Sequence, residues 1–231
     1  MDILVFPCYH ISMIIITGAS DGLGIELAKI YKDTDKKVIN ISRRNSKFAD
    51  VNLPTDLLQE SQIEKATQEI LAIEEPIEVL VNCAGVMSLE PLNSITASEI
   101  DRTFGVNARA AILLVSRLTE RLKQDHTDIV NVASTVGLKA YQDQAAYGAS
   151  KWAMRGFSQN LQIELKDTNR VISFCVGGFN SDIAKKVTGN EIPDPQNWMN
   201  PSDIAVFVKQ ITDLPKSMEV TEVVINRKQV K

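Results

Sequence analysis

The chain has 231 residues, of which 44% are hydrophobic and 23% are charged, and its formal net charge is −4. This length fits one domain with a core large enough to fold without disulfides or metals. The acidic balance argues against nucleic acids and anionic membranes as partners. Three scattered cysteines and two histidines argue against a disulfide framework and a histidine-based metal site, and favour a cytoplasmic location.

The first residues, MDILVFPCYHIS, lack the basic segment and the long apolar stretch of a signal peptide. We interpret residues 1–12 as an extension ahead of the first strand; an extra edge strand or a packed coil is the alternative. No apolar run reaches the length of about 18 residues that a membrane span requires. We therefore expect no membrane segment.

Short apolar runs alternate with longer amphipathic ones over 13–231, which predicts a single α/β domain. Several apolar runs are rich in Val and Ile without polar alternation, which is typical of parallel strands covered on both faces. The pattern predicts a Rossmann-type doubly wound parallel sheet of about seven strands with helices on both faces. The expected strands are 13–17, 37–42, 77–82, 128–133, 170–176 and 219–226, and the expected helices lie near 23–33, 60–74, 97–123, 146–167 and 201–212.

One further strand is expected near 49–53, where the chain runs into Pro54 with no crossover helix before it. Proline is tolerated at the edge of a sheet, and the third strand of the Rossmann order lies at that edge. We therefore place this strand at the edge.

A glycine-rich stretch, TGASDGLG, lies between the first strand and the first helix. Gly18, Gly22 and Gly24 would let the backbone approach a pyrophosphate, whose charge is stabilised at the positive N-terminus of a helix. A plain turn is the alternative, and the position between strand and helix favours the phosphate site.

This G-x-x-x-G-x-G spacing resembles that of the short-chain dehydrogenase/reductase family. NCAG, from Asn82 to Gly85, resembles the N-N-A-G of that family, with Cys83 in place of the second Asn. Asn107, in FGVNARA, falls at the position of the family's helix asparagine.

The resemblance continues in QAAYGASKWA, which contains a Y-x-x-x-K motif formed by Tyr147 and Lys151. Ser134, in NVAST, stands thirteen residues before Tyr147, which is the usual interval in the family. The similarity covers roughly 13–226. It implies an oxidoreductase that transfers hydride between a nicotinamide cofactor and a small-molecule carbonyl or secondary alcohol.

Four residues make up the catalytic set. A Tyr of ordinary pKa, about 10, is a slow proton donor or acceptor near neutral pH. Lys151 lies one helical turn after Tyr147, so its charge, with that of an oxidised nicotinamide, would lower the pKa of the phenol. The resemblance implies that Lys151 also binds the nicotinamide ribose, that Ser134 orients the substrate oxygen, and that Asn107 holds a water linking Lys151 to solvent.

Each of these four residues has a structural alternative: a strand-end cap for Ser134, a helix-surface residue for Asn107, a packed aromatic for Tyr147 and a solvated charge for Lys151. Their shared order and spacing behind a phosphate loop favours the catalytic interpretation.

The end of the second strand bears on the choice of cofactor. Ser42 stands where members of the family that prefer NAD carry an acidic residue, and Arg43 and Arg44 follow it. A guanidinium can bind a 2′-phosphate in a bidentate way, which favours NADP(H). Asp21 stands where many NADP-preferring members carry a basic residue, so NAD(H) remains possible, and a solvated loop is the alternative for the arginines.

The other cofactor contacts follow from the resemblance. Asp56 would meet the adenine edge, with a helix N-cap as its alternative or additional role. After the sixth strand, VGGFNS has Val176 in place of the family's proline, which makes the turn less rigid. Phe179 and Ser181 would bind the carboxamide. The predicted cofactor-binding residues are Thr17, Gly18, Ser20, Gly22, Leu23, Gly24, Ser42, Arg43, Arg44, Asp56, Leu57, Asn82, Ala84, Gly85, Tyr147, Lys151, Gly177, Phe179 and Ser181.

Residues 182–200 lie where the family builds a substrate lid. Trp198 and Met199 could form an apolar wall there, although packing of the loop onto the core is the favoured alternative. The helices at 97–123 and 146–167 resemble those that pair between subunits in the family, which implies a homodimer or homotetramer.

Two other functions are alternatives to the enzyme. A non-catalytic NADP(H)-binding sensor or scaffold would typically have lost the Tyr or the Lys, and both are present. An epimerase or dehydratase with a tightly held nucleotide is the second rival. Release of stoichiometric oxidised cofactor would argue against it.

Overall fold

The computed structural model describes residues 12–181 and 197–228. The expected N-terminal extension, apart from Ser12, and the expected lid, apart from 197–200, lie outside the described residues. Within the described ranges, no helix has the length and apolar composition needed to cross a bilayer.

Seven strands form one sheet in the order β3-β2-β1-β4-β5-β6-β7, and every neighbouring pair is parallel. The predicted doubly wound α/β fold is therefore confirmed. The edge strand is confirmed as well, because among the described residues β3 pairs only with β2, and Pro54 stands opposite Ser42 at its end. The strands are β1 Met13–Thr17, β2 Lys37–Ser42, β3 Val51–Pro54, β4 Ile77–Asn82, β5 Asp128–Val132, β6 Val171–Val176 and β7 Glu222–Ile225.

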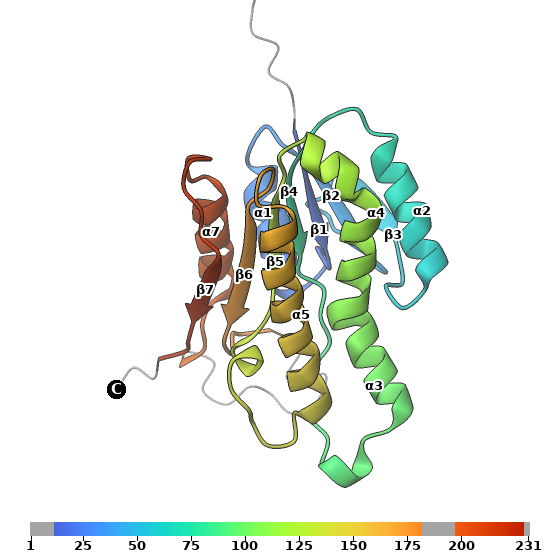
Figure 1. The fold of residues 1–231 in the computed structure, drawn as a ribbon, viewed down its shortest axis with the longest axis vertical. Coiled ribbons are helices and arrows are strands. Elements are labelled where there is room, and N and C mark those ends of the chain that lie inside the picture. The colour runs from blue at the N-terminus through green and yellow to red at the C-terminus, as the bar shows by residue number, and fades with distance from the viewer. Residues whose placement is uncertain (1–11, 182–196, 229–231) are drawn as a thin grey trace, which may run out of the picture.

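Helices cover both faces of the sheet (Figure 1). Alternate residues of β1 point to opposite sides, so Ile15 packs in one core with α2, α4 and α5, and Ile14 packs in the other with α1 and α7. Each face of the sheet therefore has its own hydrophobic core. The helices are α1 Gly22–Lys32, α2 Glu60–Leu71, α3 Ala97–Phe104, α4 Ala110–Gln124, α5 Ala145–Glu164 and α7 Pro201–Thr212.

The helix expected at 97–123 is confirmed, with one irregularity. A π-helical turn, Gly105–Arg109, separates α3 from α4. Its Asn107 is fully buried and bonds to the backbone of Val86 in the loop after β4. Single π turns inside helices often occur at functional sites. Hydrophobic periodicity could not reveal this one, because it depends on a contact with a distant loop.

The chain leaves β1 toward β2 and β3 on one side, whereas β5, β6 and β7 follow β4 on the other. The loops after β1 and β4 therefore diverge at the carboxyl edge of the sheet. Such a switch point is where open α/β sheets bind ligands.

Candidate active site

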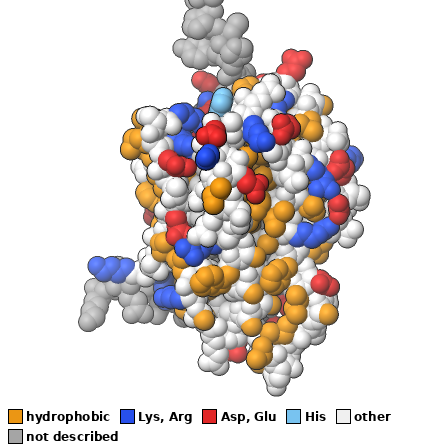
Figure 2. Space-filling view, in the orientation of Figure 1, with side chains coloured by type: hydrophobic (Ala, Val, Ile, Leu, Met, Phe, Trp, Pro, Cys, Tyr) orange, Lys and Arg blue, Asp and Glu red, His pale blue; other side chains and the backbone are white. Residues whose placement is uncertain are grey.

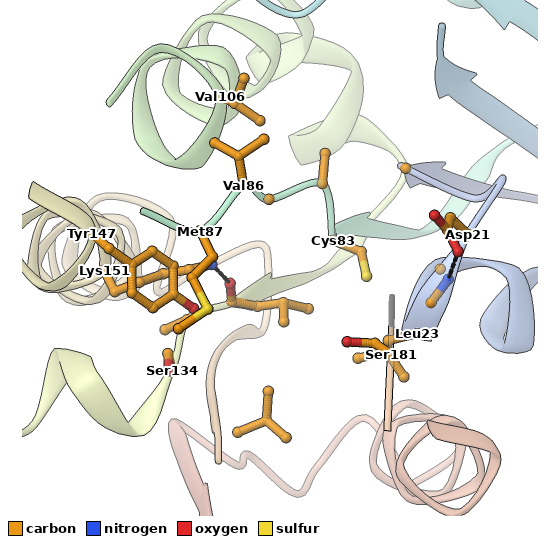
Figure 3. A pocket seen from close by; sticks show the side chains of 18 of the residues that line it. Asp21, Leu23, Cys83, Val86, Met87, Val106, Ser134, Tyr147, Lys151 and Ser181 are labelled. Carbon is orange, nitrogen blue, oxygen red and sulfur yellow. Dashed lines mark hydrogen bonds between the residues drawn. The ribbon is translucent and has the colours of Figure 1, made fainter. Parts of the chain in front are cut away.

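A cavity of about 940 Å³ lies at this carboxyl edge and takes residues from the loops after all seven strands. Figure 3 shows Tyr147, Lys151 and Ser134, with Met87 beside them, on one side of it, Asp21, Leu23 and Ser181 on the other, and Cys83 between the two groups. The cavity therefore joins the predicted catalytic residues to the predicted phosphate loop.

Among the predicted site residues, all line this cavity except Thr17, Asn82 and Asn107. The Thr17 hydroxyl accepts from the backbone N–H groups of Cys83 and Ala84, both at 3.0 Å. The Asn82 amide donates to Asn131 on β5 at 2.7 Å. These two side chains hold the strand ends together, so they position the cavity wall and are not part of it.

The glycine loop has the backbone shape that its sequence predicted. Gly18 and Gly22 have positive φ values of 76° and 52°, which side chains rarely adopt. A Cβ on Gly24 would lie 2.2 Å from the Gly18 carbonyl oxygen, and one on Gly18 would lie 3.0 Å from the Ala84 Cα. Because α1 begins at this loop, its N-terminus faces the cavity, an arrangement that fits a pyrophosphate.

An ion pair links the two segments that bear on cofactor choice. Arg44 Nη2 lies 3.0 Å from Asp21 Oδ2, and the other Asp21 oxygen accepts from the Gly22 N–H, capping α1. The Ser42 hydroxyl hydrogen-bonds to the Arg44 carbonyl at 2.7 Å and to the Ser20 hydroxyl of the glycine loop at 3.2 Å. Among the described residues, none forms an ion pair with Arg43. Arg43 thus differs from Arg44 in being available to a phosphate.

Asp56 does not cap a helix. The helix α2 begins at Glu60 with Gln59 as its N-cap, so the N-cap alternative for Asp56 is wrong. Its carboxylate instead accepts from the Leu58 N–H at 3.1 Å, within the turn before the helix. Asp56 and Leu57 both line the cavity.

Ser134, Tyr147 and Lys151 converge on one end of the cavity. Ser134 follows β5 and caps a short 3-10 turn, and its side chain hydrogen-bonds to the Tyr147 hydroxyl. The Lys151 ammonium donates to the Val132 carbonyl oxygen at 3.0 Å. Burial lowers the pKa of Lys151 to about 8.

The pKa of Tyr147 departs from the sequence-based expectation. Burial raises it above its ordinary value of 10.0, and the hydrogen bond to Ser134 opposes this only in part. The expected lowering by Lys151 does not occur, because that ammonium is turned toward Val132 and lies 6.0 Å from the centroid of the Tyr147 ring. In this geometry the phenol stays protonated at neutral pH.

The side chain of Asn107 is occupied by the protein. Its nitrogen donates to the Val86 carbonyl and to the Ser150 hydroxyl, both at 2.9 Å, and its oxygen accepts from the Val86 N–H at 2.7 Å. Both amide hydrogens are therefore used. The oxygen keeps one lone pair for the water that the resemblance implies.

The turn after β6 is held by hydrogen bonds in place of the proline. The Gly177 N–H donates to the Ile225 carbonyl at 2.8 Å, and the Asn180 N–H to that of Met199 at 2.9 Å. Met199 packs on the core, as the packing alternative predicted, whereas Trp198 lines the cavity.

Several residues of the cavity wall were not predicted. Gln144 lies one turn before Tyr147, and that spacing was the signal that could have found it. Arg227 follows β7, and its guanidinium lies 4.5 Å from the centroid of the Trp198 ring. Within the described residues, no group of three or more His, Cys, Asp or Glu side chains could hold a metal ion.

Comparison with known proteins finds one matching family and relatives described as oxidoreductases. A family described as short chain dehydrogenase matches residues 12–192. An uncharacterised oxidoreductase of Listeria monocytogenes is 26% identical over 234 residues, covering 91% of this chain and 94% of the relative.

Solved structures share the fold. A serine dehydrogenase complexed with NADP+ has a TM-score of 0.84 and 23% identity, over 92% of this chain and 94% of the other. A 4-hydroxyisoleucine dehydrogenase complexed with NADH has a TM-score of 0.81 and 23% identity, over 94% and 97%.

Proposed function

This chain belongs to the short chain dehydrogenase family and is an NAD(P)-dependent oxidoreductase, and we propose that it prefers NADP(H) and uses Tyr147 as the general acid and base. One observation carries this proposal. Ser134, Tyr147 and Lys151 meet at one end of a cavity whose other end is the glycine loop at the N-terminus of α1.

The raised pKa of Tyr147 keeps the phenol in the protonated form that carbonyl reduction requires. A protonated phenol can donate its proton to the substrate oxygen as that oxygen gains negative charge. The Ser134 hydroxyl, bonded to the same phenol, would hold that oxygen in place. The nicotinamide, when bound, supplies the hydride, and its oxidised form carries the positive charge that would lower the pKa of Tyr147 for the reverse reaction.

Each part of a nicotinamide dinucleotide can be assigned to residues at this site. The glycine loop would hold the pyrophosphate, Asp56 and Leu57 the adenine, and Arg43 the 2′-phosphate. Lys151 would bind the nicotinamide ribose, because an ammonium has three N–H donors and the Val132 carbonyl uses one of them. Gly177, Phe179 and Ser181 would meet the carboxamide, and the Asn107 oxygen would hold the relay water.

We further propose that residues 13–231 form one catalytic domain that works in the cytoplasm as a homodimer or homotetramer. Figure 2 shows hydrophobic side chains gathered on the face over α4 and α5. Ile112, Trp152 and Ile163 are 41%, 49% and 72% exposed. A Cβ on Gly156 would meet nothing within 4 Å, so a partner helix could approach α5 closely there.

The substitution Tyr147→Phe tests the proposed chemistry. We expect kcat for carbonyl reduction to fall by about 10²–10⁴-fold, with the Kd for NADPH changed less than threefold. NADPH consumption over a panel of carbonyl compounds gives the rates, and cofactor fluorescence gives the Kd. Tyr141→Phe is the matched control, since Tyr141 lines the cavity but is 45% exposed.

Near-normal rates in the Tyr147→Phe variant would reject Tyr147 as the proton donor. A wild-type protein that binds NADPH but turns over neither carbonyls nor alcohols would instead indicate a non-catalytic sensor.

A further inference from the structure

One polar atom in the cavity wall has no partner. The side-chain oxygen Oε1 of Gln144 is buried and accepts no hydrogen bond, and Gln144 lines the cavity. Gln144 stands at the N-cap of α5, but its side chain forms no capping hydrogen bond. A buried acceptor left unpaired destabilises a protein unless a ligand or a water supplies the donor.

Gln144 lies close to the reacting end of the cavity. It precedes Tyr147 by three residues at the start of α5, and side chains with this spacing are neighbours, about 5–6 Å apart at their Cβ atoms. A substrate whose carbonyl oxygen reaches the Tyr147 hydroxyl would therefore place the atoms next to its reacting carbon near the Gln144 amide.

The charges around Gln144 restrict the kind of donor. The carboxylates that line the cavity among the described residues, Asp21 and Asp56, follow β1 and β3. Among the same described residues, the lining cations are more numerous: Arg43 and Arg44 after β2, Arg102 on α3, Lys139 after β5, Lys151 on α5 and Arg227 after β7. Asp143 precedes Gln144 but does not line the cavity.

This arrangement disfavours a cationic donor such as an ammonium group, because among the described residues the lining cations outnumber the lining carboxylates. A neutral hydroxyl meets no such repulsion. It can donate to Gln144 Oε1 without bringing a charge into the cavity.

We propose that Gln144 is a substrate-binding residue that accepts a hydrogen bond from a hydroxyl group one or two carbons from the reacting carbonyl. The substrates are then hydroxylated ketones or aldehydes, neutral or anionic, and the products are the corresponding diols. This inference rests on the proposed function and adds the substrate class to it.

Three ketones of nearly equal size test the proposal: 2-butanone, 1-hydroxy-2-propanone and aminoacetone, which carry a methyl, a hydroxyl and an ammonium group at the same place. A longer pair, 2-pentanone and 4-hydroxy-2-butanone, covers a hydroxyl one carbon further away. For the wild type we expect kcat/KM to be at least tenfold higher for the hydroxyl compound of one pair than for its methyl analogue, because an unpaired buried acceptor penalises the analogue.

Two substitutions of Gln144 separate its role from general packing. Gln144→Met removes the acceptor at similar volume, and the hydroxyl-to-methyl ratio should fall to within twofold. Gln144→Glu keeps an acceptor, so the ratio should persist while aminoacetone reduction rises. Gln142→Met is the matched control, because Gln142 is exposed and does not line the cavity, and its ratio should equal that of the wild type.

Each contrary result has its own meaning. A wild-type ratio near one in both pairs, or a ratio that survives Gln144→Met, would overturn the inference while leaving the proposed function intact. Aminoacetone as the best substrate would overturn the hydroxyl assignment. Were none of these ketones reduced, the wider panel of carbonyls and alcohols would decide the proposed function, and the inference would be judged by thermal-shift titration with NADPH present, where equal Kd values within both pairs reject it.

Discussion

The Asn107 amide donates to the Ser150 hydroxyl at 2.9 Å and joins the π-helical turn Gly105–Arg109 to α5. Ser150 in turn donates to the Tyr147 carbonyl at 2.7 Å. The same Asn107 side chain holds both backbone groups of Val86. One buried amide therefore fixes the loop after β4 relative to the helix that carries Tyr147.

Replacing Asn107 by Leu should destabilise the protein by roughly 3 kcal/mol, because the buried N–H and C=O of Val86 and the Ser150 hydroxyl each lose a partner. Ser150→Ala should cost only about 1 kcal/mol, since Asn107 keeps its two bonds to Val86. Urea unfolding at pH 7 gives both values. Equal losses in the two variants would show that the Val86 bonds contribute nothing measurable.

The substitution Arg43→Ala should raise the Kd for NADPH about tenfold, which is the typical loss of one charge-assisted hydrogen bond. The Kd for NADH should change less than twofold, because NADH carries no 2′-phosphate. Fluorescence titration of both cofactors measures the difference. Equal effects on the two would reject a role for Arg43 in binding the 2′-phosphate.

The Asp21–Arg44 ion pair gives a prediction of opposite sign. Asp21→Asn should lower the Kd for NADPH severalfold, since it releases Arg44 from its partner and removes a negative charge from the cavity wall. The cap of α1 should survive, because Asn is as good an N-cap as Asp. An unchanged or higher Kd for NADPH, with the melting temperature unchanged, would contradict this.

Buried Lys151 should make stability depend on pH in a defined window. Its pKa is about 8 in the folded protein and 10.5 ordinarily, so below pH 8 both folded and unfolded chains carry the charge and the full penalty of about 3 kcal/mol applies. As the pH rises from 8 to 10.5, the folded protein loses its proton first and the penalty fades.

Lys151→Met should therefore stabilise the protein by about 2 kcal/mol at pH 7, after a loss of about 1 kcal/mol for the unpaired Val132 carbonyl. Near pH 10.5 this gain should vanish. Unfolding free energies at both pH values measure it, with the exposed Lys139→Met as control. A gain of equal size at both pH values would show that the charge is not its cause.

The apolar face over α4 and α5 should be an interface between copies of the chain. Ile163→Arg places a charge in that face and should reduce the mass in solution toward that of one chain. Leu71→Arg, on α2, is the matched control, because Leu71 is also exposed, at 39%. Sedimentation velocity distinguishes the species, and a wild-type protein that sediments as a monomer would disprove the interface.

Patterns within short stretches of sequence were sufficient to predict the fold. Runs of Val and Ile predicted five strands to within one residue, whereas β7, Glu222–Ile225, is shorter than the predicted 219–226. Pro54 predicted which strand lies at the edge, because proline interrupts the hydrogen bonds of a central strand. The glycine spacing predicted the loop at the start of α1. These features act over a few residues, and strand order then follows from the handedness of parallel connections.

The behaviour of individual groups in the cavity depended on residues that are far apart in the chain. The Tyr147 pKa rises because α5 and the elements around it bury the phenol, Asp21 neutralises Arg44 across 23 positions, and Asn107, in a π-helical turn, bonds to Val86 across 21 positions. The unpaired oxygen of Gln144 also results from contacts between residues that are far apart in the chain. Which groups are buried and which are paired depends on how the molecule packs, and the order of residues along the chain does not reveal either.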